Sequence, residues 1–148
     1  MSEITPKYIR LTRNVVSEMF DECNRLYFNN AVERPLKIET WTPHKRTVGM
    51  VRPIWSANRN KVGSVLCISR RYRWTADNLR KVVVHEMIHL AIEDYKMPLT
   101  FLQRLPLIGR FFIKEHDDNF MNLMNGLNEE YSLDITVRMK QMRKDFIR

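Results

Sequence analysis

The sequence has 148 residues, of which 44% are hydrophobic, and it carries a formal net charge of +8 at pH 7. A chain of this length and apolar content is expected to fold as one globular domain, residues 1–148, and not to be disordered. The pI of about 9.8 favours a polyanionic partner such as nucleic acid.

No membrane span and no secretion signal are expected. No run of 18 or more apolar residues is present, and a helix would need about that many to cross a bilayer. The N-terminal stretch MSEITPKYIR lacks the apolar core of a signal peptide. Cys23 and Cys67 fit no C-x-x-C spacing, so we expect buried free thiols in a reducing intracellular compartment, either cytoplasm or nucleus or nucleoid.

Residues 6–29 predict an N-terminal helix, because their apolar residues fall mostly on one helical face. We expect Thr5 to cap this helix, Pro6 to occupy its first position and the pair Asn29-Asn30 to end it. Its expected role is packing.

Three short runs of alternating residues predict strands at 36–41, 46–51 and 62–69. Loops of this size favour a three-stranded antiparallel sheet in meander order. Gly49, in the second run, indicates a bulge or a close approach of the backbone.

Basic and aromatic residues alternate around the ends of these strands. Such a mixture is able to hold single-stranded nucleic acid by charge and stacking. Trp55 lies in a predicted turn and is the best candidate for an exposed platform, whereas we expect Trp41 and Trp74 in the core. The full set is Arg46, Arg52, Arg59, Lys61, Arg70, Arg71, Arg73, Trp41, Trp55, Tyr72 and Trp74.

Residues 75–95, TADNLRKVVVHEMIHLAIEDY, predict the central helix, with Thr75 as its N-cap. Residues 82–92 are apolar all round the helix except for His85, Glu86 and His89. A helix that is apolar all round is a buried one, and polar groups buried together must be satisfied by some partner.

The H-E-x-x-H spacing places His85 and His89 about 40° apart and about 6 Å along the axis, so that both imidazoles could bind one metal ion. Glu86 lies beside the pair, where it could take a proton from a metal-bound water. The alternative is a core helix whose two histidines are hydrogen-bonded to backbone carbonyls. The convergence of the three polar residues favours the metal.

Residues 115–131 predict a C-terminal helix with an inward stripe at i, i+3, i+4 and i+7, formed by Phe120, Leu123, Met124 and Leu127. His116 extends this face by one turn and is the favoured third metal ligand. Glu93, Glu115 and Asp117 compete for that place.

Two further segments have distinct compositions. Residues 97–114 form an apolar insertion, interrupted by prolines, that is expected to be a lid, a partner-binding arm or a cover for the core. Residues 132–148 form a basic tail that could touch phosphates. The longer pattern H-E-x-x-H-x-x-G-x-x-H is excluded, because Ile92 and Tyr95 stand at its Gly and His positions.

The order of these features resembles the SprT-like metalloprotease domain, the family that includes Spartan. The resemblance covers residues 14–130. It rests on Phe28-Asn29-Asn30, residues 36–41, Arg46-Thr47-Val48-Gly49, Ile68-Ser69, His85-Glu86-Met87-Ile88-His89, and His116 followed by Phe120 and Met124.

The resemblance implies a compact zincin-like α+β fold, with Zn²⁺ held by His85, His89 and His116 and with Glu86 as the general base. It also implies a zinc-dependent endopeptidase that acts on proteins associated with or crosslinked to DNA. The chain departs from the family in having no C-terminal zinc ribbon with paired C-x-x-C. Its gap between the second and third histidines is also longer, and residues 97–114 fill that gap.

Two other functions remain open. One is a basic nucleic-acid-binding module with a structural zinc and little or no protease activity. The other is an interaction protein on a zincin scaffold that uses residues 97–114 as its contact surface. Glu86 argues against both, because a structural zinc needs no adjacent base. For a peptidase, Tyr95, Tyr131 or an arginine are the candidates to stabilise the oxyanion besides zinc.

Overall fold

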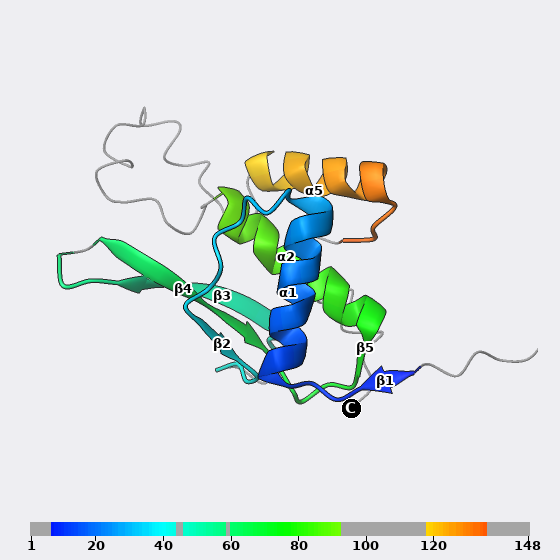
Figure 1. Cartoon of the computed structure of the whole chain (residues 1–148), viewed down its shortest axis with the longest axis horizontal. Coiled ribbons are helices and arrows are strands. Elements are labelled where there is room, and N and C mark those ends of the chain that lie inside the picture. Colours follow the sequence, from blue (N-terminus) through cyan, green and yellow to red (C-terminus); the bar gives the residue numbers. More distant parts are fainter. Residues whose placement is uncertain (1–6, 44–45, 59, 93–117, 136–148) are drawn as a thin grey trace, which may run out of the picture.

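The computed structural model describes residues 7–43, 46–58, 60–92 and 118–135. Within these ranges, three helices and two small sheets form an α+β domain, which confirms the predicted class (Figure 1). Helices α1 (Arg13–Tyr27) and α2 (Ala76–Ile92) pack against the three-stranded sheet. Helix α5 (Asp118–Tyr131) lies across the end of this helix pair that is far from strands β1 (Tyr8–Ile9) and β5 (Trp74–Thr75) (Figure 1). None of the described helices is long and apolar enough to cross a membrane.

The first helix begins later than its amphipathic pattern predicted. Helix α1 is Arg13–Tyr27, and the Thr12 side chain caps it by accepting a hydrogen bond from the Val15 N–H at 3.1 Å. The prediction that Thr5 caps a helix from residue 6 is therefore wrong. Residues 8 and 9 instead form strand β1, Tyr8–Ile9, because they pair antiparallel with β5.

The end of α1 agrees with the prediction, and a buried side chain fixes it. Asn29 and Asn30 both have positive φ, 54° and 60°, a conformation that asparagine tolerates better than most residues. Asn24 is buried, and its side-chain amide donates to the Val32 carbonyl at 3.0 Å and accepts from the Val32 N–H at 3.1 Å. This amide clamp holds the chain against α1 as it leaves the helix.

The three-stranded sheet is mixed, so the prediction of an antiparallel meander is wrong. The strand order is β2-β4-β3, with β2 at Lys37–Glu39, β3 at Gly49–Trp55 and β4 at Lys61–Ile68. Strand β4 pairs antiparallel with β3 but parallel with β2. Residues 63–68 are buried throughout, and a strand buried on both faces belongs in the centre of a sheet. Pro53 has no N–H to donate, which suits the edge strand β3.

Two of the three tryptophans have the exposure that was predicted, and the third does not. Trp74, in strand β5 (Trp74–Thr75), is 1% exposed and donates its indole N–H to the Ser69 carbonyl at 2.7 Å, so its core position is confirmed. Trp41 is 52% exposed, which contradicts the expected core position. Strand β2 ends at Glu39, so the alternation of the strand does not continue to Trp41. Trp55 is 44% exposed, as predicted.

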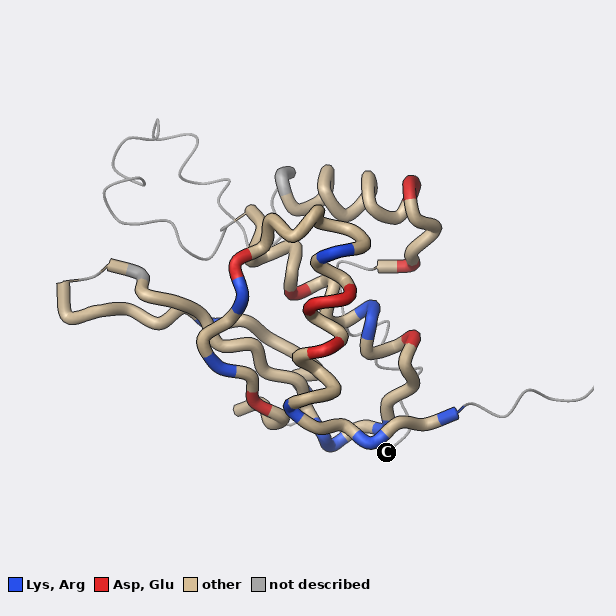
Figure 2. Tube along the Cα trace, in the orientation of Figure 1, with Lys and Arg blue, Asp and Glu red and all other residues tan. Residues whose placement is uncertain are grey.

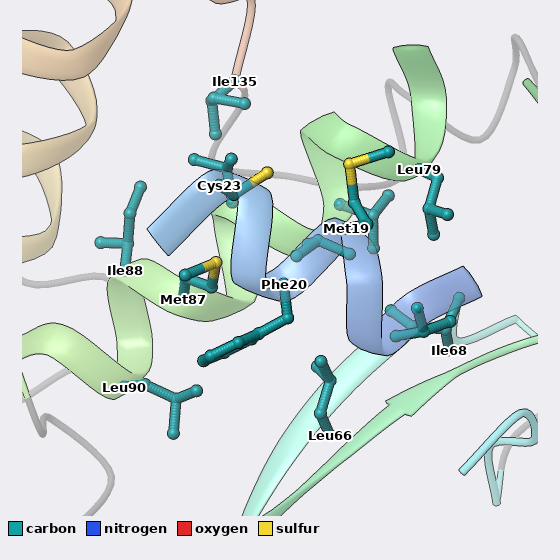
Figure 3. Close-up of a cluster of buried hydrophobic side chains, with 14 of the residues drawn as sticks. Met19, Phe20, Cys23, Leu66, Ile68, Leu79, Met87, Ile88, Leu90 and Ile135 are labelled. Atoms are coloured by element: carbon teal, nitrogen blue, oxygen red, sulfur yellow. The ribbon is translucent and has the colours of Figure 1, made fainter. Parts of the chain in front are cut away.

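The core lies between α1, α2 and the sheet. Figure 3 shows side chains from α1, from α2 (Ala76–Ile92) and from β4 converging on one apolar cluster. Phe20 projects from α1 into this cluster and is fully buried. Gly49 of β3 allows the sheet to approach α2 closely, since a Cβ there would lie 2.7 Å from Val82 Cγ1. The close backbone approach predicted at Gly49 is confirmed, whereas the sheet irregularity lies further on, between Ile54 and Trp55.

Replacing Gly49 by Ala is expected to lower the free energy of unfolding by about 1–3 kcal/mol, because the added methyl overpacks a buried contact. Its nearest neighbours would be Val82 Cγ1 at 2.7 Å and Ile68 Cδ1 at 3.2 Å, both on fully buried side chains. Gly126→Ala is the matched control, because nothing lies within 4 Å of a Cβ at that helical position. The control should leave stability unchanged or raise it by up to about 1 kcal/mol. Urea unfolding of both variants measures the difference, and equal stabilities would contradict the close approach.

Candidate metal centre

A side-chain cap fixes the start of helix α2, and most of the helix is buried. The Thr75 hydroxyl accepts a hydrogen bond from the Asn78 N–H at 3.1 Å, which confirms the predicted N-cap. Residues 82–90 are all buried, as expected for a helix that is apolar on every side. The polar residues of the H-E-x-x-H motif are therefore carried into the interior by the apolar residues around them.

Three polar side chains are buried within this segment. His85, Glu86 and His89 are only 2%, 4% and 6% exposed. The centroids of the two imidazole rings lie 5.2 Å apart at an interplanar angle of 68°, so the rings meet edge to face on one side of α2. The geometry predicted from the i, i+4 spacing is thus present, with the carboxylate on the adjacent residue.

Phe120, near the start of α5 (Asp118–Tyr131), packs against both histidine rings. Its ring centroid lies 5.1 Å from that of His85 and 4.6 Å from that of His89. The sequence placed Phe120 only on the inward stripe of its helix. The burial of Phe120, Met124 and Leu127 confirms that stripe, but helical periodicity does not say which neighbour the stripe meets.

The histidine pair fits a zinc ion in spacing and in chemistry. Two imidazoles bound to one tetrahedral ion through Zn–N bonds of about 2 Å would have ring centroids about 5 Å apart. The observed separation is 5.2 Å. Neutral imidazole is a common zinc ligand, and Glu86 directly follows His85 in the sequence, as in the H-E-x-x-H motif.

The candidates for a third ligand fall outside the described residues. His116 and its competitors Glu93, Glu115 and Asp117 all lie in the range 93–117, which the structure does not describe. Within the described ranges, no group of three or more His, Cys, Asp or Glu residues gathers around one point. His116 precedes Phe120 by four residues in the sequence, and Phe120 touches both histidine rings.

Tyr131 does not reach the histidines, so this candidate for oxyanion stabilisation is removed. Tyr131 lies eleven residues after Phe120 on α5, which corresponds to about 16 Å along the helix axis. Its ring packs edge to face on Tyr27 with centroids 5.0 Å apart. Both tyrosines line a separate pocket of about 330 Å³ that also includes Arg80 and Lys81.

The two cysteines are buried free thiols, as predicted, and neither is activated. Burial raises the pKa of Cys23 to about 12, and burial likewise raises the pKa of Cys67. A thiol nucleophile or metal ligand needs the thiolate form. Burial therefore disfavours the thiolate form of both described cysteines.

Comparison with known proteins adds no relative. No family model matches the chain, and neither the curated proteins nor the solved structures contain a match. The function must be inferred from the residues of this chain and from their geometry.

Replacing Phe120 by Leu is expected to shift the imidazole proton resonances of both His85 and His89, because an aromatic ring 4.6 to 5.1 Å away perturbs them. Phe20→Leu is the matched control, since it makes the same change at another fully buried phenylalanine. Each variant should lose about 1 kcal/mol of stability. Proton NMR then separates them, and histidine resonances that move equally in both variants would contradict the contact with Phe120.

Proposed function

We propose that this chain is a zinc-dependent endopeptidase of the SprT-like type that acts on proteins associated with DNA. The observation that carries the proposal is the burial of His85, Glu86 and His89 together on α2, with the two imidazoles 5.2 Å apart. A buried polar trio is costly unless each group has a strong partner. A cation bound by the imidazoles supplies one, and it gives the neighbouring carboxylate a chemical role.

His85, His89 and His116 are the residues that would hold the zinc. His85 and His89 are fixed on one buried helix, so little side-chain entropy is lost when they bind. His116 is the preferred third ligand because it stands four residues before Phe120, whose ring lies against both histidines. When bound, zinc supplies Lewis acidity and makes a water molecule more acidic.

Glu86 is the proton carrier in this reaction. Its carboxylate is buried one residue from His85, where it accepts a proton from the water that attacks the peptide carbonyl carbon. The new carbon–oxygen bond forms as the carbon–nitrogen bond breaks, and Glu86 passes the proton to the departing amine. One carboxylate therefore acts first as base and then as acid.

The net charge of +8 supports the nucleic-acid part of the proposal. A strongly basic protein is drawn to polyanions, and this concentrates it near proteins that are bound to them. The alternative is a nucleic-acid-binding module with a structural zinc. Glu86 disfavours this alternative, because a buried carboxylate beside two zinc ligands adds cost and no strength to a purely structural site.

Replacing Glu86 by Gln is expected to leave zinc bound while cleavage of casein, or of the protein itself, falls by roughly 10²–10⁴-fold. The amide keeps the volume of the side chain but cannot accept the proton. Zinc content and cleavage are measured with and without DNA, and His85→Ala is the control that should lose both. A wild-type protein that holds zinc and binds DNA but cleaves nothing would favour the binding module.

Replacing His116 by Ala is expected to lower the zinc content more than Glu93→Ala or Glu115→Ala does. An imidazole completes the three-histidine set, whereas the two carboxylates are its competitors for the third place. Metal analysis of the purified variants after dialysis measures the effect. Equal zinc loss in the three variants would contradict the assignment of His116.

A further inference from the structure

Many of the described cations already have carboxylate partners. Glu39 illustrates this, because the ammonium of Lys37 lies 3.3 Å and the guanidinium of Arg52 lies 3.4 Å from its two oxygens. Burial opposes ionisation of Glu39, but the positive charges of Lys37 and Arg52 outweigh this effect, so the pKa of Glu39 is lowered. Further ion pairs within the described ranges are Arg34 with Asp21, Arg80 with Glu22, and Lys81 with Asp77 and Asp134. Because a neighbouring carboxylate offsets the charge of each of these cations, they contribute less to the positive potential outside the protein.

Six of the remaining exposed cations gather at one end of the molecule (Figure 2). We call this group the β1–β5 basic surface; its members are Lys7, Arg10, Arg13, Arg70, Arg71 and Arg73, all exposed and in no ion pair with another described residue. Figure 2 shows Lys and Arg segments concentrated along this end, opposite α5. The two stretches that supply them, residues 7–17 and 69–76, contain no Asp or Glu.

The fold joins these two stretches although about 60 residues separate them. Strand β1 pairs antiparallel with β5, with Tyr8 opposite Thr75 and Ile9 opposite Trp74. Arg10 directly follows the paired Ile9, and Arg73 directly precedes the paired Trp74. The strand pairing therefore places cations from both stretches beside one another.

The arginine-rich turn before β5 is held by bonds at its base. The Trp74 indole donates to the Ser69 carbonyl at 2.7 Å, and the Arg70 N–H donates to the Thr40 carbonyl at 3.3 Å. Tyr72 and Trp74 are buried while Arg71 and Arg73 are exposed. The alternation turns the aromatic residues inward and the guanidinium groups outward, so the charged face is preorganised.

One aromatic ring belongs to the surface. Tyr8 is 37% exposed, and the guanidinium carbon of Arg73 lies 5.5 Å from its ring centroid. Tyr8 is the only described large hydrophobic residue of these two stretches that is exposed. A membrane-binding surface needs a substantial apolar face beside its cations, and this surface lacks one. Dense guanidinium groups around a single ring instead match the chemistry that contacts a phosphate backbone.

We propose that the β1–β5 basic surface binds the phosphate backbone of nucleic acid. This proposal rests on the proposed function, because it names the surface through which the endopeptidase reaches DNA-associated proteins, but the binding itself needs no catalysis. Helix α2 starts immediately after β5, and His85 lies nine residues beyond Ala76. That spacing is about 14 Å along the helix, so a protein attached to the bound strand is within reach of the histidines.

The test compares two triple variants of the full chain. Arg10→Gln/Arg70→Gln/Arg73→Gln removes three cations from the surface, and Arg25→Gln/Arg34→Gln/Lys37→Gln removes three exposed cations elsewhere. Each variant has a net charge of +5, which is +8 minus 3. Binding to fluorescent single-stranded and duplex oligonucleotides is followed by anisotropy as a function of salt. Thermal melting shows whether the folds are intact.

The surface variant should bind single strands at least about tenfold more weakly at 100 mM salt, and its slope against log salt should fall by about 2, since each lost phosphate contact removes about 0.7. For a duplex the slope should fall by somewhat more, about 0.9 for each contact. The control variant should bind within about twofold of the wild type.

The proposal is overturned if the surface variant binds as wild type does, or if the control weakens equally. It is also overturned if phosphatidylserine vesicles bind the wild type while neither oligonucleotide does. Zinc content and casein cleavage are measured on the same samples. If both are absent from the wild type while nucleic-acid binding still depends on this surface, the surface assignment stands and the endopeptidase proposal fails.

Discussion

The cost of burying three polar side chains on one apolar helix governs the architecture around α2. Removing an imidazole or a carboxylate from water without a partner costs several kcal/mol, which is a large fraction of the stability of a domain of this size. His85, Glu86 and His89 are nonetheless almost fully buried. None of the three is without a partner, and the other residues from 82 to 90 are apolar and buried.

Apolar side chains from several elements pack around α2. Helix α1 and strand β4 supply the apolar mass, as Figure 3 shows for Phe20, Leu66 and Ile68. Strand β3 comes close enough to touch Val82 because Gly49 has no side chain. Helix α5 places Phe120 against both imidazoles. Apolar side chains therefore surround the helix on several sides, and the two histidine rings themselves contact an aromatic ring.

Local signals in the sequence predicted the elements but not how the strands are ordered. The cap at Thr75, the buried character of residues 82–90 and the inward stripe of α5 are local properties, and all three were predicted correctly. The position of β4 between β2 and β3 depends on contacts between residues far apart in the chain. The apolar run at 65–68 and Pro53 in β3 were the available signals, since they indicate a central and an edge strand respectively.

The candidate site could be predicted only in part, because only some of its contacts lie within one helix. The i, i+4 spacing of His85 and His89 is a helical property, so the ring pair followed from the motif alone. The contact with Phe120 joins two helices and could not be derived from periodicity. The start of α1 was also missed, because Thr5 and Thr12 both have capping side chains and only the pairing of β1 with β5 decides between them.

Two asparagine side chains, Asn24 in α1 and Asn128 in α5, make the ends of their helices sensitive to deamidation. Asn24 holds both backbone groups of Val32, and Asn128 holds both groups of Ile135 in the same way, with each hydrogen bond at 2.9 Å in the second case. Deamidation of either residue would replace the donating NH₂ by an oxygen and set it against a carbonyl oxygen at about that separation, where two acceptors repel. Deamidation of one asparagine would therefore release the chain segment that follows its helix.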